Sequence, residues 1–317
     1  MKAIIATASG VTVADRPEPR PLPHEIKVKV RAVGVNRIDL VALNAPANQI
    51  IGMEWAGEVS EIGTDVTRFR IGDRVMGTGS AAYAEYVVTD ETRACPLGSS
   101  GATSWPMAAS LTLALQTMHD ALVTRGRMAP GATVLIHGAS SAMGLVGMQI
   151  AKLLGARTVI GTSSTATRRS QLADFSCDVA VDTTQPEWAQ QVLQATEGRG
   201  VDIVVDQVSG PQFNQCMHAA AIGGRIVNVG RLGGASASFD FNLHALRRLE
   251  YIGVTFRTRS REDIRQLNDL MLKDMSEALG KGAIRLPIHR IYAFADGAQA
   301  LNDMKANQHF GKLVLEL

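Results

Sequence analysis

Cysteines are scarce in this chain of 317 residues. Cys95, Cys177 and Cys216 lie far apart in the sequence, and no CxxC spacing occurs. An odd number of distant cysteines argues against a disulfide framework and against a cysteine-rich zinc lobe. Such a chain fits a reducing compartment, and we expect to find it in the cytoplasm.

The chain also lacks long apolar runs and a large net charge. No uninterrupted apolar stretch approaches the roughly 18–20 residues of a membrane span, and the short apolar run at the N-terminus indicates a first strand rather than a signal peptide. A net charge of +2 is too small to attract nucleic acid or an anionic membrane. No basic stripe interleaved with aromatic residues is present either. We therefore expect a small-molecule partner, with no nucleic acid and no membrane.

Two patterns of secondary structure follow one another along the chain. The first hundred residues predict a compact body of short strands separated by Gly and Pro, since several segments alternate apolar and polar residues. The pattern then changes to helices alternating with short apolar strands, which predicts an α/β domain with a doubly wound parallel sheet of the Rossmann type. Two strand-like segments near the C-terminus indicate a return to the first domain. The expected domains are 1–118 with 259–317, and 119–258.

A turn between a predicted strand and a predicted helix resembles a phosphate-binding loop. It reads HGASSAMGLVG from His137 to Gly147, and the N–H groups at the start of such a helix attract phosphate. The glycine positions of GxGxxG fall on Ala139, Ser141 and Gly144, all small enough to admit a phosphate. An unliganded turn is the alternative. The residues expected to bind the pyrophosphate are Ser140, Ser141, Ala142, Met143 and Gly144.

The segment that follows favours NADPH over NADH. A dinucleotide fold that selects NAD usually carries an acidic residue about 20 residues further on, but residues 157–173 contain no Asp or Glu. Hydroxyl and guanidinium groups stand there instead, and these suit a 2′-phosphate. Two exposed arginines on a helix are the alternative, and Arg168 is the stronger candidate of the pair. The residues expected at the 2′-phosphate are Ser163, Ser164, Thr165 and Arg168.

At this point the chain resembles a known family, the zinc-independent medium-chain dehydrogenases/reductases of the quinone oxidoreductase and zeta-crystallin branch. The resemblance covers nearly the whole chain. It implies that the β-body is a GroES-like, mainly-β catalytic domain beside an NADPH-binding Rossmann domain, and that two chains form a homodimer through the segment YIGVTF at 251–256. The motifs that carry it are GVNRIDL at 34–40, GMEWAGEVSEIG at 52–63, GDRVMG at 72–77, AYAEYVV at 82–88, HGASSAMG at 137–144, GRIVNVG at 224–230 and FGKLVL at 310–315.

The same resemblance bears on metal binding. Zinc-dependent relatives place a cysteine and a histidine where this chain has Asn36 and Met53. Zinc prefers thiolate, imidazole or carboxylate ligands in a tetrahedral array, and neither residue belongs to that set. We expect no catalytic metal.

The resemblance also implies roles for individual residues near the nicotinamide and the substrate. For Asn36 and Asp39, capping of a turn is the alternative. The expected catalytic residues are Asn36, Asp39, Thr117 and Arg231. The further residues expected at the cofactor are Val208, Gly230, Arg231, Phe310 and Lys312.

The expected function is NADPH-dependent hydride transfer to a quinone or to an α,β-unsaturated carbonyl compound. The sequence does not choose between these acceptors, and it offers no evident proton donor. The loop between Asp39 and Gly52 is shorter than in the family, which leaves the substrate class open. An alcohol or ketone dehydrogenase is one alternative, and a non-catalytic, NADPH-binding structural or RNA-associated protein is another.

Overall fold

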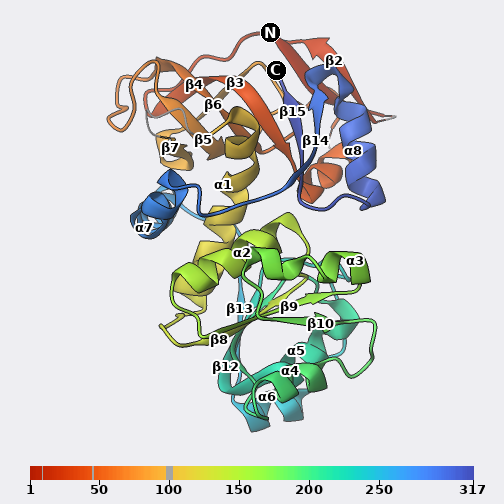
Figure 1. Ribbon diagram of the computed structural model, residues 1–317. Helices are drawn as coiled ribbons and strands as arrows, with labels where there is room; N and C mark the ends of the chain where they lie inside the picture. Colours follow the sequence, from red (N-terminus) through yellow and green to blue (C-terminus); the bar gives the residue numbers. More distant parts are fainter. Residues whose placement is uncertain (9, 45, 98–102) are drawn as a thin grey trace. The chain divides into compact units, whose positions relative to one another are not determined.

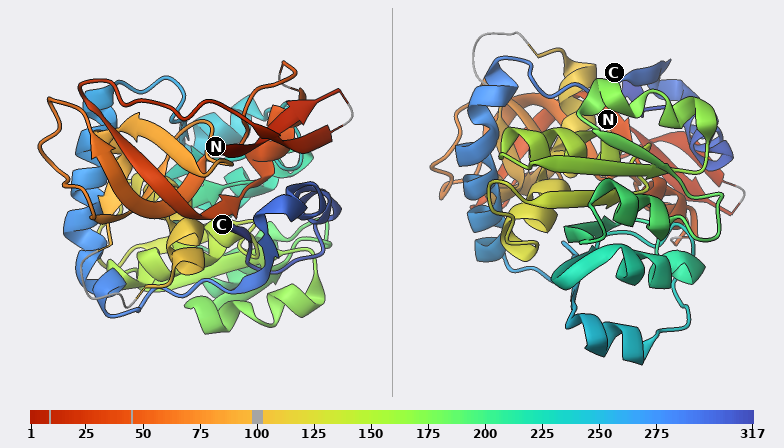
Figure 2. Two further views of the ribbon diagram at one scale, coloured as in Figure 1. Left: turned by 90° about the horizontal axis from the view of Figure 1, so that it is seen from above. Right: turned by 60° about the horizontal axis from the view of Figure 1, so that its bottom comes forward.

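The computed structural model describes residues 1–8, 10–44, 46–97 and 103–317. These residues form two compact units, Met1–Leu113 with Arg259–Leu317 (unit 1) and Ala114–Thr258 (unit 2). The boundary lies inside helix α1 (Trp105–His119), a few residues before the position expected from the sequence. Both chain ends belong to unit 1 and lie near one another in every view (Figures 1 and 2).

Unit 1 is built on a mainly antiparallel sheet, as the sequence predicts for a GroES-like domain. Its strand order is β14-β15-β3-β4-β5-β7, and β6 also pairs with β3. The last strand of the chain pairs antiparallel with β3, with Leu313 opposite Val35, which is the predicted return of the C-terminus. The strands are β3 (Glu25–Val35), β4 (Glu54–Ile62), β5 (Arg74–Thr78), β6 (Tyr86–Asp90), β7 (Ala94–Pro96), β14 (Ile288–Ala293) and β15 (Lys312–Glu316). A separate hairpin joins β1 (Lys2–Thr7) to β2 (Gly10–Asp15).

Close packing in unit 1 depends on a large buried side chain beside a small residue. Trp55 on β4 is fully buried, and a Cβ at Gly77 on the neighbouring strand would lie 2.4 Å from its ring. Glycine at position 77 therefore leaves the space that the indole fills. Helix α7 (Arg261–Gly280) starts with a capping box formed by Ser260 and Asp263 and packs against the turn Glu91–Arg93. Helix α8 (Gly297–Ala306) covers β15.

Unit 2 holds a six-stranded, wholly parallel sheet in the order β10-β9-β8-β11-β12-β13. In chain order this is the 3-2-1-4-5-6 arrangement of a doubly wound dinucleotide fold, and the strand order reverses between β8 and β11. Ligands of such sheets bind at the carboxyl ends of the strands beside this point of reversal. The strands are β8 (Thr133–His137), β9 (Thr158–Ser163), β10 (Val179–Asp182), β11 (Val201–Asp206), β12 (Ala220–Asn228) and β13 (Glu250–Gly253).

Helices cover both faces of this sheet. Figure 1 shows α2 and α3 on one face, and α4, α5 and α6 on the other. The apolar strands need both layers, because nearly all their side chains are buried. The helices are α2 (Ala142–Leu153), α3 (Ala166–Arg169), α4 (Ala189–Ala195), α5 (Phe213–Ala219) and α6 (Phe241–Arg247).

Three elements differ from the sequence pattern. The segment 165–175 contains no Gly or Pro and predicts one helix, but it is broken into α3 and a separate 3-10 turn, Leu172–Phe175. The segment 250–258 predicts a strand, which ends at Gly253 in the structure. Helix α1 continues into a π-helical segment, Asp120–Arg125. In the part of the chain that the structure describes, no helix combines the length and the apolar character that crossing a membrane requires.

Candidate active site

The predicted phosphate loop lies between β8 and α2 in unit 2. Ser141 is the N-cap of α2, and its hydroxyl accepts a hydrogen bond of 3.0 Å from the N–H of Gly144. The first N–H groups of a helix have no acceptor within it, so those of Ala142 and Met143 face outward as possible anion donors. A Cβ at Gly144 would lie 2.5 Å from Cα of Ala139, so glycine is required where the helix meets the turn.

Side chains from the neighbouring strands close around this loop. The hydroxyl of Ser163, at the end of β9, donates to that of Ser140 at 3.1 Å. Beyond the end of β11, Gln207 accepts a hydrogen bond of 2.8 Å from Ser141. Val208 lies against Gly138, where an added Cβ would be 3.1 Å from its methyl group. The N–H of Gly230 donates to the carbonyl of Asp206, the last residue of β11, at 3.2 Å. The structure thus brings four predicted cofactor segments to one edge of the sheet, namely 140–144, Ser163, Val208 and Gly230.

The two arginines after β9 differ in their surroundings. Arg169 forms an ion pair of 3.0 Å with Asp182 and donates to the carbonyl of Ser163 at 3.0 Å. Both of these contacts of its guanidinium are made within unit 2. Arg168 is half-buried, and Ser164 and Thr165 beside it are exposed.

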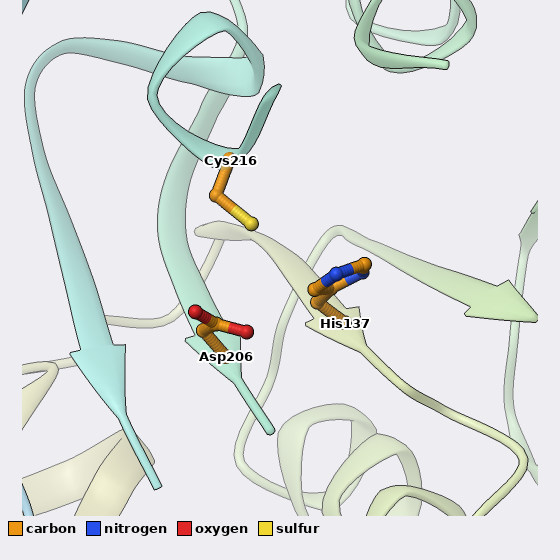
Figure 3. Close-up of side chains that lie close together, drawn as sticks. All are labelled: His137, Asp206 and Cys216. Atoms are coloured by element: carbon orange, nitrogen blue, oxygen red, sulfur yellow. The ribbon is translucent and has the colours of Figure 1, made fainter. Parts of the chain in front are cut away.

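A buried cluster lies where the strand order reverses. Its members are His137 at the end of β8, Asp206 at the end of β11 and Cys216 on α5, and their side chains point toward one another (Figure 3). A ring nitrogen of His137, a carboxylate oxygen of Asp206 and Sγ of Cys216 all lie within 4.8 Å of one another. Asp206 accepts hydrogen bonds from the N–H groups of Val208 and Ser209, both at 2.9 Å. Burial lowers the pKa of His137 and raises that of the Cys216 thiol well above its usual range. The imidazole and the thiol are therefore neutral.

The remaining predicted residues of unit 2 differ in exposure. Thr117 is buried on α1, whereas Arg231 is exposed just after Gly230.

In unit 1, the predicted residues Asn36, Asp39 and Lys312 belong to one buried polar network. The ammonium of Lys312 donates to Oδ1 of Asn36 at 2.8 Å and to Oε2 of Glu54 at 2.6 Å. Nδ2 of Asn36 donates to the same carboxylate oxygen at 2.9 Å. Lys312 is 3% exposed and Glu54 is fully buried, so the ion pair is desolvated and each charge depends on the other.

Asp39 and Tyr83 extend the network. One carboxylate oxygen of Asp39 accepts both the N–H of Asn36, at 2.8 Å, and the hydroxyl of Tyr83, at 3.0 Å. Burial raises the pKa of Asp39 to about 7, against the opposing effect of these two hydrogen bonds and of the Lys312 charge. Burial also raises the pKa of Tyr83 well above its usual range. Asp39 therefore exchanges a proton near neutral pH while Tyr83 keeps its own.

This network does not suit a metal ion. Asn36 presents a neutral amide whose oxygen already accepts a hydrogen bond from an ammonium group, and Met53 offers only a thioether. A cation placed beside Asn36 would be repelled by Lys312. No step through a metal follows from these residues.

Two residues of the network were not predicted from the sequence as site residues. Glu54 stands in the quoted motif GMEWAGE and Tyr83 in AYAEYVV, but nothing in either pattern reveals their partners. Lys312, predicted to contact the cofactor, donates hydrogen bonds to Asn36 and Glu54 inside unit 1. Phe310 lies half-buried two residues before it.

Comparisons with known proteins agree with this architecture. Residues 22–114 match the model of the alcohol dehydrogenase GroES-like domain, and residues 142–273 match that of the zinc-binding dehydrogenases. The quinone oxidoreductase of Pseudomonas aeruginosa is 30% identical over 93% of this chain and 92% of its own length. The quinone oxidoreductase-like protein 2 of Bos taurus is 29% identical over 99% and 92%.

A longer relative and two solved structures are also similar to this chain. A mycocerosic acid synthase-like polyketide synthase of Mycolicibacterium smegmatis is 29% identical over 94% of this chain, which spans only 14% of that protein. The quinone oxidoreductase of Pseudomonas syringae pv. tomato superposes with a TM-score of 0.87 at 26% identity, over 100% of this chain and 99% of that one. A mycobacterial protein solved in complex with NADPH does so with a TM-score of 0.87 at 27% identity, over 100% of both chains.

Proposed function

Because the chain belongs to the quinone oxidoreductase branch of the medium-chain dehydrogenase/reductase superfamily, we propose that it is an NADPH-dependent reductase. Its acceptors are quinones or α,β-unsaturated carbonyl compounds, and it works without zinc. The observation that carries the proposal is the phosphate loop of unit 2, whose serine-capped helix and glycine turn lie where the strand order reverses. We also propose that the protein works in the cytoplasm, as expected from its sequence.

Three features of unit 2 support NADPH as the cofactor. The N-terminus of α2 supplies backbone donors for the pyrophosphate. Ser163, Ser164 and Thr165 end the strand that usually carries an acidic residue in NAD-binding folds, and Arg168 follows them with a guanidinium for the 2′-phosphate. The mycobacterial structure with NADPH, at 27% identity, adds an independent argument.

When bound, the cofactor supplies a hydride for an electron-poor carbon. The roles left to the chain are binding and orientation. We assign the pyrophosphate to Ser140–Gly144, and contacts with the nicotinamide half of the cofactor to Thr117, Val208 and Gly230, all of which belong to unit 2. The exposed Arg231 is placed to attract an anionic group or a carbonyl oxygen. Asp39, with its pKa of about 7, is the group of this site that changes protonation state near neutrality.

A metal-free mechanism is supported by the residues of unit 1. The amide of Asn36 and the thioether of Met53 stand where zinc-dependent relatives have a cysteine and a histidine, and Lys312 places a positive charge against Asn36. These residues favour the reductase over an alcohol dehydrogenase that depends on zinc.

We also propose that two copies of this chain form a homodimer. Strand β13 lies at the edge of the six-stranded sheet, and an unpaired edge invites a second strand. Tyr251 on this strand is exposed, as are Phe241 and Leu246 on α6. Light scattering should give twice the chain mass, and Ile252→Pro should shift the protein toward a monomer. A monomer mass for the parent chain at all concentrations would contradict the dimer.

The activity is tested by following NADPH oxidation with a chelator present, using a simple quinone and a simple enone in parallel. Turnover with NADPH, faster than with NADH, on either acceptor supports the proposal. Turnover only after zinc is added, together with oxidation of an alcohol, would support a zinc-dependent dehydrogenase instead. NADPH binding without turnover on either acceptor would contradict the reductase.

A further inference from the structure

The buried histidine of the unit 2 cluster has one ring nitrogen without a partner. Nδ1 of His137 lies 2.9 Å from the hydroxyl oxygen of Thr162. Nε2 is buried and has no hydrogen-bond partner among the described residues. The imidazole stacks on the ring of Trp188, with centroids 4.9 Å apart and planes inclined by 19°. A buried polar atom costs free energy until a partner satisfies it, so a ligand at Nε2 would stabilise the cluster.

Asp206 brings a carboxylate to the same place. It is fully buried, and no lysine or arginine of the described chain forms an ion pair with it. Its Oδ1 accepts the N–H groups of Val208 and Ser209, both at 2.9 Å. Its Oδ2 lies 3.2 Å from the hydroxyl of Ser209, whose single hydrogen also has the carbonyl of Gly230 within reach at 2.9 Å. Oδ2 thus keeps lone pairs for a cation, which a buried carboxylate needs.

Cys216 on α5 completes a set of ligands for a soft divalent cation. Its side chain is fully buried, and it points toward His137 and Asp206 (Figure 3). Thiolate, imidazole and carboxylate are the ligands that zinc takes in proteins. Magnesium and calcium prefer oxygen ligands alone. The chemistry of the three side chains therefore favours a zinc-like ion.

The spacing of the three ligand atoms is close to that of a zinc site. Asp206 is the register partner of His137 on the neighbouring parallel strand, so the sheet itself places these two ligands side by side. The three ligand atoms all lie within 4.8 Å of one another. Ligands of a tetrahedral zinc ion lie about 3.4–3.6 Å apart, so the atoms need to approach one another by less than about 1.5 Å. Rotation of the side chains supplies a movement of this size.

We propose that His137, Asp206 and Cys216 form a binding site for zinc or a similarly soft divalent cation. When the ion binds, the S–H bond of Cys216 breaks, its proton passes to solvent, and the S–metal bond forms. Nε2 of His137 and an oxygen of Asp206 each give a lone pair to the ion. Three protein ligands leave the fourth position of a tetrahedral ion to a small ligand such as water.

The site lies wholly in unit 2, and no step of the reduction proposed above passes through it. Metal binding and reductase activity can therefore fail independently of one another. The ion supplies the cation that the buried carboxylate of Asp206 lacks, so its expected effect is on the stability of unit 2.

The other cysteine of unit 2 provides a matched control. Cys177 is also buried, and its thiol donates to the carbonyl of Val179 at 3.1 Å. It is not a member of the cluster. Cys177→Ser therefore measures what the loss of a buried thiol does to unit 2 without removing a proposed ligand.

The experiment compares the parent chain with Cys216→Ser and Cys177→Ser. Each protein is unfolded in urea and refolded with cobalt(II), because a fully buried site opens to an ion only when the chain opens, and gel filtration then removes loose ion. The parent and Cys177→Ser should retain one cobalt per chain and show the near-ultraviolet charge-transfer band of a cobalt–thiolate bond. Cys216→Ser should lose this band and bind cobalt at least about tenfold more weakly.

Thermal unfolding gives a second readout. Zinc should raise the Tm of the parent and of Cys177→Ser, because it binds the folded state, but not that of Cys216→Ser. Magnesium should raise none of them. If Cys216→Ser does not fold, His137→Gln carries the same tests, since it removes the imidazole and keeps a polar side chain. If the parent does not refold, zinc analysis of protein purified from zinc-supplemented cells replaces the refolding.

Two results would overturn the inference. One is a parent chain that retains no metal, and the other is a Cys216→Ser variant that retains the metal and the band as the parent does. A parent chain that binds cobalt in this way but reduces no acceptor would contradict the proposed function alone.

Discussion

The two polar regions of this molecule are built in opposite ways. In unit 2, the phosphate loop relies on backbone N–H groups, small residues and a serine cap, all within a few residues of one another in the chain. In unit 1, the network joins side chains from positions 36, 39, 54, 83 and 312, and charged groups carry it. We expect the first region to depend mainly on its backbone shape, and the second to depend on each charged partner.

This difference has an energetic origin. A buried charge is stable only with its partner, so loss of one member leaves the other without compensation. A helix N-terminus keeps its donors whatever side chains surround it. We therefore expect the largest effects of substitution in unit 1, and effects confined to cofactor binding in unit 2.

The largest effect should follow from removing one charge of the buried pair. Lys312→Met leaves the fully buried carboxylate of Glu54 without its cation, and we expect a loss of up to about 5 kcal/mol in the free energy of unfolding. The double variant Lys312→Met/Glu54→Gln should recover a large part of this loss, because no charge stays buried. Urea unfolding of the two single variants and the double variant measures the coupling. Strictly additive losses would show that the two groups are independent.

The protonation of Asp39 should appear in the pH dependence of stability. Its pKa rises from an ordinary 3.8 to about 7 in the folded protein, so the folded state holds this proton more tightly than the unfolded chain. Stability from this group is fully present below about pH 4 and is lost as the pH rises through 7, by about 4 kcal/mol. Asp39→Asn keeps the oxygen that accepts from Asn36 and Tyr83 and does not titrate.

Unfolding curves of the parent chain and of Asp39→Asn between pH 4 and 8 test this assignment. The parent should lose stability relative to the variant as the pH rises. Parallel curves would mean that Asp39 is already ionised at pH 4.

Unit 2 should respond to shape rather than to charge. A Cβ at Gly144 would lie 2.5 Å from Cα of Ala139, so Gly144→Ala must push the helix start away from the turn, at a cost of about 1–3 kcal/mol. We expect weaker NADPH binding with little change in the unfolding of unit 1. Gly253→Ala is a useful control, since an added Cβ at that glycine of unit 2 has no neighbour within 4 Å among the described residues and its φ lies outside the left-handed region. Unchanged NADPH affinity in Gly144→Ala would contradict the placement of the pyrophosphate.

The smallest effect should separate the two arginines. Arg168→Ala should lower the affinity for NADPH about tenfold, or roughly 1.4 kcal/mol, without affecting NADH. Arg169→Ala should alter both cofactors alike, because Arg169 is paired with Asp182 and bonded to Ser163. Calorimetric titration of each variant with both cofactors measures the preference. A larger loss of NADPH selectivity in Arg169→Ala would reverse the assignment.

The same contrast explains what the sequence could predict. The Rossmann domain and its loop follow from local patterns, since strand, turn and helix are adjacent in the chain and each has a short-range signature. The resemblance to known reductases pointed to Asn36, Asp39 and Lys312, but not to the contacts among them. Glu54 and Tyr83 meet these residues only after the sheet of unit 1 forms, and no spacing in the sequence encodes that meeting.

Local propensity also failed where tertiary packing decided the outcome. The segment 165–175 has few breakers, yet Arg169 turns toward Asp182 and the helix ends there. The apolar run at 250–258 reads as one strand, but β12 offers partners only as far as Asn228, opposite Gly253. In the second case the neighbouring strand, rather than the sequence of the element, limits its length.

The most direct test of the account is a single-turnover measurement on chelator-treated protein, with an acceptor that supports turnover and with NADPH carrying deuterium at both C4 positions. Hydride transfer from the cofactor predicts a slower rate with the deuterated cofactor than with ordinary NADPH, and no gain in rate when zinc is added. Equal rates with the two cofactors, or a reaction that starts only with zinc, would contradict a metal-free hydride transfer by this chain.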